Sequence, residues 1–215
     1  MVYADLEGTL SEKIVELSWA NSAGKLAEAE KILKHMLAEE RRNLSNATNI
    51  DEFIEMNEIS HRAHVKSGAT LLKGQPPSIL YAPLELTKAS PKIFEMGERD
   101  RNLSIVTCTD EGPASYFCES HKVPFYNIQA SSRLKVDPFT GSLTGEFERY
   151  CGGKEKADAY NGIEDVVGNS NGDLRLFKKA IESGHKAYLV RNGHGPMEVI
   201  FSETLDKFGL DYDVL

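Results

Sequence analysis

Short apolar runs alternate with helical patterns along most of the chain. After residue 88, apolar runs of strand length are separated by stretches with helical spacing. They predict strands at 103–107, 125–129, 164–167 and 187–190, helices at 90–98, 113–121, 155–161 and 172–183, and a hairpin over 134–147. The first apolar run, at residues 1–4, predicts one more strand. Alternating strands and helices predict an α/β fold whose mostly parallel sheet is covered on both faces.

The stretch between the first strand and residue 89 shows helical spacing only. It predicts one helix that begins at the N-cap Ser11 and is ended by Gly24, one over 25–42, and one over 51–64 ended by Gly68, with a polar turn at 44–49. We therefore expect a core formed by residues 1–10 and 89–215. Residues 11–88 would be inserted into it as a helical bundle that caps the core.

Two carboxylates follow the first strand, at Asp5 and Glu7. Residues i and i+2 just past a strand end project to the same side, so both face one spot, and Gly8 lets the chain bend sharply away. One carboxylate can attack a substrate while the other handles protons. The alternative is an ordinary strand-to-helix turn with acidic residues near a helix N-terminus.

Other polar groups lie at the ends of later strands. Thr107 ends the strand at 103–107, and the strand at 164–167 leads into the segment 168–173, which begins Gly-Asn and ends in Asp173. Ligands of parallel α/β sheets bind beyond the carboxyl ends of the strands. Asp5, Thr107 and Asn169 each follow such an end, so the sequence predicts that they form one site.

These segments resemble the motifs of the haloacid dehalogenase superfamily of phosphatases. The family has Asp-x-Asp-x-Thr, a strand ending in Ser or Thr, a Lys, and Gly-Asp-x-x-x-Asp. This chain has Asp-Leu-Glu-Gly-Thr at 5–9, Thr107, a lysine at 154 or 156, and Gly-Asn-Ser-Asn-Gly-Asp at 168–173. The resemblance covers nearly the whole chain and implies a Rossmann-like core with a helical cap, in the branch that includes phosphoserine phosphatases.

The resemblance also implies roles for the residues. Asp5 attacks phosphorus and forms an aspartyl-phosphate, and Glu7 protonates the departing alcohol and then activates water. Thr107 donates a hydrogen bond to a phosphoryl oxygen. Cys108 is a further candidate phosphate-binding residue, against the alternative of an inert buried thiol. Mg²⁺ is the implied cofactor, and its candidate ligands are Asp5, Glu7, Asn169 and Asp173.

A lysine would neutralise the transferring phosphoryl group and keep Asp5 ionised. Lys156 is favoured because the segment around it best matches the family's Gly-x-x-Lys helix start. Lys154 is the alternative, and a solvated lysine is the plain interpretation of either.

Two residues depart from the family pattern. Glu7 replaces the second Asp and reaches about 1 Å farther, while proton transfer needs about 2.6–3.2 Å between heavy atoms. Asn169 replaces a metal-binding Asp, which keeps a carbonyl oxygen but removes one negative charge. We therefore expect weaker Mg²⁺ binding than in the family pattern.

The predicted substrate is a small-molecule phosphomonoester, with phosphoserine favoured. The segment 141–147 resembles the flap of the phosphoserine phosphatase branch, and Glu12 resembles its contact to the substrate amino group. Arg62 could pair with a substrate carboxylate. An exposed helix face is the plainer interpretation of Glu12 and Arg62. The histidines show no metal-ligand spacing, and we expect them to be surface or structural residues.

Charge and composition narrow the partners. The chain has 215 residues and a net charge of −8, which argues against a nucleic-acid-binding surface and against binding to an anionic membrane. No apolar run approaches the ~20 residues of a membrane-spanning helix. Three cysteines without metal-ligand spacing suggest reduced thiols in a cytoplasmic protein. The expected assembly is a monomer or a homodimer. Two other functions stay open: a phosphotransferase to a small alcohol such as homoserine, and a degenerate, non-catalytic binding protein.

Overall fold

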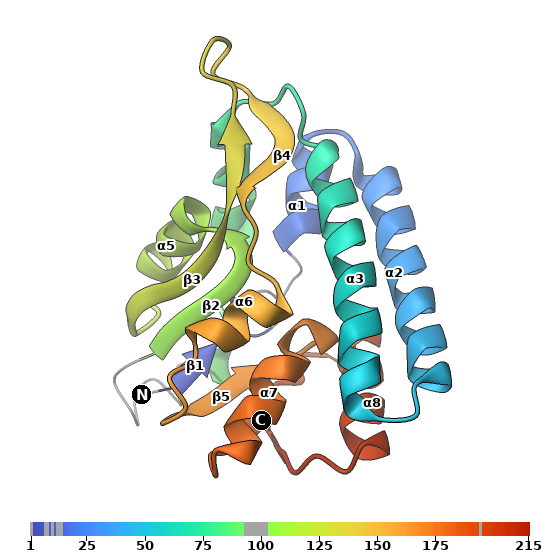
Figure 1. Cartoon of the computed structure of the whole chain (residues 1–215). Coiled ribbons are helices and arrows are strands. Elements are labelled where there is room, and N and C mark those ends of the chain that lie inside the picture. The colour runs from blue at the N-terminus through green and yellow to red at the C-terminus, as the bar shows by residue number, and fades with distance from the viewer. Residues whose placement is uncertain (1, 7–8, 10, 12–14, 93–102, 194) are drawn as a thin grey trace.

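A computed structural model describes residues 2–6, 9, 11, 15–92, 103–193 and 195–215 and contains a seven-stranded sheet (Figure 1). The strands lie in the order β4-β3-β2-β1-β5-β6-β7. Neighbouring strands are parallel except β3 and β4, which form an antiparallel hairpin. Their bounds are β1 Val2–Ala4, β2 Leu103–Asp110, β3 Phe125–Val136, β4 Leu143–Arg149, β5 Asp165–Gly168, β6 Ala187–Leu189 and β7 Asp213–Val214. The predicted α/β fold with a Rossmann-like, mostly parallel sheet is confirmed.

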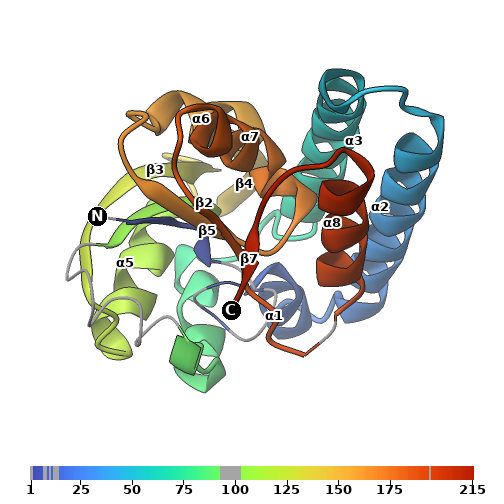
Figure 2. The same cartoon turned by 90° about the horizontal axis from the view of Figure 1, so that it is seen from below.

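Helices cover both faces of this sheet (Figure 2). α6 and α7 lie on one face and α5 lies on the other, while α2 and α3 stand side by side next to the sheet, with α8 beside α2. The α-helices are α1 Val15–Ser22, α2 Leu26–Asn46, α3 Ile50–Thr70, α5 Glu111–Ser120, α6 Gly153–Ala159, α7 Leu174–Glu182 and α8 Pro196–Lys207, and the short 3₁₀ helices are η2 Pro77–Leu80, η3 Ala82–Leu86 and η4 Asn171–Asp173.

The central strands supply side chains to a core on each face. In β1, Val2 and Ala4 belong to one buried cluster and Tyr3 to the other. In β2, Ile105 joins the first cluster and Val106 the second. Successive residues of a strand point to opposite faces, so a sheet buried on both sides needs continuous apolar runs. This explains why the strands of the sequence are short apolar runs rather than alternating ones.

Two cap helices are longer than predicted. α2 runs to Asn46 rather than Arg42, through residues that we expected to form a turn. Lys207 of α8 donates to the carbonyls of Leu44 and Ala47 at this helix end, a tertiary contact that the local sequence cannot show. α3 runs to Thr70 and passes through Gly68, which we expected to end it. A glycine inside a helix costs only about 1 kcal/mol, which packing can outweigh.

Other boundaries also differ from the prediction. β2 continues to Asp110, so Thr107 lies inside the strand, two residues past Ile105, the last residue paired with β1. β3 is continuous over 125–136, where a strand and a separate hairpin were expected. α8 and β7 were not predicted, although Gly-Pro at 195–196 and the apolar spacing after it are typical of a helix start. The helix expected over 90–98 lies largely outside the described residues.

The β3–β4 hairpin is tied to the helical insertion. Gly74 N–H donates to the carbonyl of Leu143, and Leu143 N–H donates to the carbonyl of Gln75. Gly145 in β4 has a φ of +81°, and a Cβ there would lie 3.1 Å from the Thr70 backbone, so only glycine fits without strain. Across the described residues, no helix combines the length and the apolar character that crossing a membrane requires.

Candidate active site

A buried lysine bridges two carboxylates at the carboxyl edge of the sheet. Lys156 Nζ lies 2.8 Å from Asp5 Oδ1 and 2.8 Å from Asp173 Oδ1, and these three side chains are at most 4% exposed. Asp5 directly follows β1, and its N–H donates to the carbonyl of Val167 in the neighbouring strand β5. Residues 151 positions apart in the chain therefore meet where parallel strands end.

Opposite charges in this cluster stabilise one another. Burial disfavours the charged form of Lys156, but the carboxylates of Asp173 and Asp5 outweigh it and hold its pKa well above the usual value. Lys156 is therefore a permanent cation at neutral pH. A cation this close favours the ionised form of a neighbouring carboxylate.

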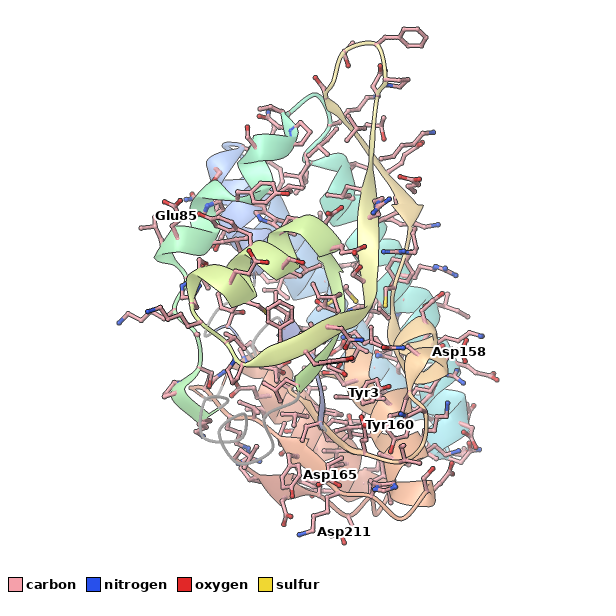
Figure 3. All side chains as sticks on the ribbon, turned by 90° about the vertical axis from the view of Figure 1, so that its left-hand side faces the viewer. Tyr3, Glu85, Asp158, Tyr160, Asp165 and Asp211 are labelled. Carbon is pink, nitrogen blue, oxygen red and sulfur yellow. The ribbon has the colours of Figure 1, made fainter. Side chains whose placement is uncertain are left out.

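Local packing places Lys156 at the second turn of α6. The Glu155 side chain accepts a 3.0 Å hydrogen bond from Gly152 N–H and so closes the start of the helix. At the other end, the Tyr160 ring packs edge-on against Tyr3 of β1, with centroids 5.2 Å apart (Figure 3). α6 is therefore held against the strand that precedes Asp5.

The segment after β5 folds around Asp173. Its Oδ2 accepts hydrogen bonds from the N–H groups of Asn169 at 3.2 Å and Ser170 at 3.4 Å. A Cβ on Gly168 would lie 2.5 Å from the same oxygen, so the loop can close over Asp173 only with glycine there. Asn169 Oδ1 accepts a 3.2 Å hydrogen bond from Thr9 Oγ1, which links the first and last motifs.

Thr107 and Cys108 of β2 differ in burial and in their relation to the cavity near Asp5. Thr107 is fully buried, and its Oγ1 accepts a 3.0 Å hydrogen bond from Thr109 N–H. Cys108 is half-buried and lines the cavity next to Asp5, whereas Thr107 is not among the described lining residues. The cysteines at 108, 118 and 151 form no disulfide bond.

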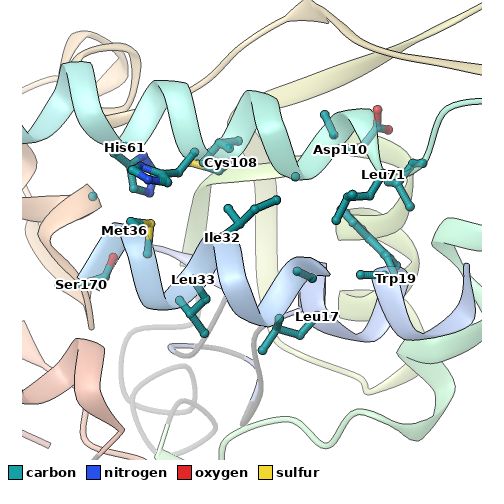
Figure 4. A pocket seen from close by; sticks show the side chains of 18 of the residues that line it. Leu17, Trp19, Ile32, Leu33, Met36, His61, Leu71, Cys108, Asp110 and Ser170 are labelled. Atoms are coloured by element: carbon teal, nitrogen blue, oxygen red, sulfur yellow. The ribbon is translucent and has the colours of Figure 1, made fainter. Parts of the chain in front are cut away.

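A cavity of about 150 Å³ opens from this cluster between α2 and α3 (Figure 4). Asp5, Lys156, Asn169 and Ser170 line one part of it. Such cavities, mostly apolar with a few placed polar groups, are the usual form of small-molecule sites.

His61 of α3 is a cavity residue that the sequence did not single out. Its Nδ1 lies 3.3 Å from the Tyr150 hydroxyl, and burial, followed by the charge of Lys156, lowers the pKa of His61 to about 4. It is therefore a neutral hydrogen-bonding group at pH 7. The sequence held no signal for this position, because its exposure depends on how α3 lies over the sheet.

Comparisons with known proteins bear on the fold. The sequence matches no family model and no curated protein. Among solved structures, a substrate-bound phosphoserine phosphatase superposes with a TM-score of 0.65 at 18% identity, covering 99% of this chain and 91% of that one. A phospho-aspartyl intermediate analogue of phosphoserine phosphatase gives 0.63 at 18% identity, with 99% and 90% covered. A HAD family hydrolase from Salmonella enterica serovar Typhi gives 0.62 at 13% identity, with 87% and 61% covered.

The chain has the phosphoserine phosphatase fold. The expected haloacid dehalogenase-like architecture, a Rossmann-like core with helices inserted after the first strand, is thus confirmed as a fold. At 18% identity the likeness says nothing of the substrate.

Within this phosphoserine phosphatase fold, the remaining predicted residues fall into three groups. Glu7 and Glu12 lie outside the described residues. Lys154 is exposed and pairs with Asp158 on the surface of α6, so Lys156 alone of the two candidates contacts Asp5. Arg62 lies 3.3 Å from Glu155, outside the lining of this cavity, and lines a smaller adjoining hollow that shares His61 and Gly172 with it.

The donor atoms near Asp5 fit a hard cation such as Mg²⁺. Within the described residues, no group of three or more His, Cys, Asp or Glu side chains is placed to hold a metal ion. Mg²⁺ does not need one, because it commonly binds through one or two carboxylates and keeps several waters. Asp5 supplies a carboxylate and Asn169 an amide oxygen, and two carboxylates against one ammonium leave a net negative charge in the cluster.

Proposed function

We propose that this protein is a Mg²⁺-dependent phosphatase that hydrolyses a small phosphomonoester through an aspartyl-phosphate on Asp5. The observation that carries the proposal is the buried Lys156 ammonium, 2.8 Å from both Asp5 and Asp173. Phosphoryl transfer depends mostly on positioning and on neutralising charge, and this cluster supplies a nucleophile and a fixed cation together.

In the first step, one oxygen of Asp5 forms a bond to phosphorus while the bond to the ester oxygen breaks. Lys156 neutralises charge on the phosphoryl oxygens and keeps Asp5 ionised. Thr107 and Cys108 come from the strand next to β1, and we assign Thr107 to the phosphoryl group by resemblance and Cys108 because it lines the cavity. The departing alkoxide needs a proton, a role that the sequence assigns to Glu7.

In the second step, water attacks the phosphorus of the aspartyl-phosphate, and Glu7 takes its proton. Asp5 is released with inorganic phosphate as the product. Asp5, Glu7, Asn169 and Asp173 would hold Mg²⁺, which supplies further charge neutralisation for the phosphoryl oxygens when bound. Asp173 would also hold Lys156 and the 168–173 loop through its hydrogen bonds.

The helices over residues 11–88 would form a cap that selects the leaving group. The sequence favours phosphoserine, with Glu12 and Arg62 as its contacts. Phosphotransfer to a small alcohol and a non-catalytic binding role are the alternatives. Glu7 in place of Asp favours the first, and Asn169 in place of Asp favours the second.

The test is phosphate release from a panel of phosphomonoesters, phosphoserine included, with and without Mg²⁺. We expect Mg²⁺-dependent turnover in the wild type and in Lys154→Met, and none in Asp5→Asn. Release that appears only when an alcohol such as homoserine is added would indicate the phosphotransferase. A folded, Mg²⁺-binding protein without turnover on any ester would refute the proposal.

A further inference from the structure

The cavity next to Asp5 changes character along its length. Asn169 and Ser170 line it near the ion cluster, whereas its walls between the helices are apolar (Figure 4). Trp19 of α1 and Leu71 lie at the end far from Ser170, with side chains of α2 between. The apolar walls include Trp19, Ile32, Leu33, Met36, Val65 and Leu71.

Each cation and histidine that the structure describes in the cavity lining already has a polar partner. Lys156 binds Asp5 and Asp173. His61 is half-buried and neutral at pH 7. His64 places its Nδ1 2.7 Å from the Ser60 carbonyl oxygen and its Nε2 3.6 Å from Glu39 Oε2. The described lining therefore offers no further cation for a substrate carboxylate.

Among the described residues of the lining, Asp110 is the acidic residue outside the ion cluster. Both of its carboxylate oxygens accept hydrogen bonds from backbone N–H groups. Oδ1 accepts from Gly112 N–H at 3.3 Å and caps α5, and Oδ2 accepts from Leu134 N–H at 2.7 Å. Phosphoserine carries both an ammonium and a carboxylate, and burying either without a partner is costly. The described lining fits such a substrate poorly.

We propose that the substrate is the phosphate monoester of a small apolar alcohol, whose hydrocarbon part fills the cavity between α2 and α3. This inference rests on the proposed phosphatase function and replaces phosphoserine as its substrate. The whole cavity, of about 150 Å³, would hold a molecule of roughly the size of benzene, and because the phosphoryl group takes part of that space the hydrocarbon part has about four carbons. The phosphoryl group lies at the polar end, beside Asp5.

The proposal predicts a dependence on chain length. Each methylene moved from water into an apolar cavity strengthens binding by about fourfold. In a series of n-alkyl phosphates, KM should therefore fall by about that factor per carbon, up to about four carbons, and then level off or rise. n-Butyl phosphate should have a higher kcat/KM than O-phosphoserine, which is of similar size.

Binding of alkylphosphonates tests the cavity without turnover. Isothermal titration calorimetry compares hexylphosphonate with methylphosphonate on the Mg²⁺-loaded protein. Because about four carbons fit in the cavity beside the phosphoryl group, hexylphosphonate buries about three more methylenes than methylphosphonate and should bind about 50-fold more tightly. A ratio below about threefold would overturn the inference, because it is less than one buried methylene contributes.

Gly68 gives a variant that fills the cavity. It lines the cavity inside α3, and a Cβ built on it has no atom within 4 Å. Gly68→Leu should weaken hexylphosphonate binding by about tenfold or more and leave methylphosphonate unchanged, since it displaces about two to three methylenes of ligand. Ser67→Leu adds the same side chain to the exposed side of α3 and should change neither. Ala29→Leu, which enters the cavity from α2, repeats the test if Gly68→Leu does not fold.

The outcomes separate this inference from the proposed function. Tight hexylphosphonate binding that Gly68→Leu weakens, without phosphate release from any ester, would uphold the apolar ligand and refute the phosphatase. Phosphate release that is best with O-phosphoserine, together with equal binding of both phosphonates, would uphold the phosphatase and refute the apolar substrate. Release that rises with alkyl chain length upholds both.

Discussion

A buried glutamate on α2 should make the protein less stable as the pH rises through the neutral range. Glu40 is 2% exposed, and Asn171 Nδ2 donates to its Oε2 across 3.4 Å. Burial raises the pKa of the Glu40 carboxyl from 4.5 to about 7, and the hydrogen bond from Asn171 offsets only part of this. The folded protein therefore holds a proton here that the unfolded chain releases.

The size of the effect follows from the two pKa values. Because the pKa of Glu40 is higher in the folded protein than in the unfolded chain, its contribution to the free energy of unfolding is fully present below pH 4.5 and is lost as the pH rises through about 7. The shift from 4.5 to about 7 corresponds to about 3 kcal/mol at 1.36 kcal/mol per unit. Glu40→Gln keeps a neutral amide in place of the protonated acid and removes this titration. The variant should match the wild type at pH 4.5 and exceed its free energy of unfolding by about 3 kcal/mol at pH 7.5.

Urea unfolding between pH 4.5 and 8 measures the difference. With a slope of about 2–3 kcal/mol per molar, the midpoint of Glu40→Gln should lie about 1 M above that of the wild type at pH 7.5. Groups that titrate equally in both proteins cancel in the comparison.

Glu39, next to Glu40 in the chain, supplies a control because its pKa is shifted in the opposite direction. The hydrogen bond from Ser60 lowers the pKa of Glu39, so its contribution is present at neutral pH and is lost as the pH falls. Glu39→Gln should therefore be less stable than the wild type at pH 7.5, and the gap should close in acid. A Glu40→Gln effect that does not change with pH, or a loss of stability at pH 7.5, would refute the reasoning.

Three further predictions concern the candidate site and the thiols. Lys156→Met leaves two buried carboxylates without their cation and should lower the free energy of unfolding by about 3–5 kcal/mol in thermal or urea melts, whereas Lys154→Met, on the surface, should change it by less than about 1 kcal/mol. Asn169→Asp restores a negative ligand and should lower the Mg²⁺ dissociation constant by about tenfold in calorimetry; equal constants would show that the amide does not weaken the site. Burial raises the pKa of Cys118 to about 12 and of Cys151 to about 11, so neither should react with iodoacetamide at pH 8 in the native protein, and mass spectrometry should find both labelled only after unfolding.

The position of the ion cluster could be predicted because it depends on topology. Asp5 and Asn169 follow strands that the apolar pattern locates, and parallel strands end at one edge of a sheet. Those two placements need only the order of the elements and the direction of the strands, which the sequence pattern gives. Lys156 could be chosen over Lys154 because the segment around it resembles the family's Gly-x-x-Lys helix start.

Features that depend on packing between distant elements could not be predicted. α2 extends past residue 42 where Lys207, 160 or more residues away, caps its last carbonyls. His61 lines the cavity because of how α3 lies over the 168–173 loop. Nothing in the local spacing of residues indicates that His61 and His64, one turn apart, both line the cavity.

The cap helices and the loop that holds Asp173 are joined by polar contacts on the side opposite the hairpin. Glu40 of α2 accepts from Asn171 of that loop, and Arg175, at the start of α7, binds Glu58 of α3 through two hydrogen bonds of 2.6 and 2.9 Å. The cavity lies between the same two helices. A hydrocarbon group that separates or draws together α2 and α3 therefore acts on residues directly bonded to the loop around Asp173. Asn171 and Arg175 therefore join α2 and α3 to the segment around Asp173, so a change in the spacing of the two helices would reach that segment.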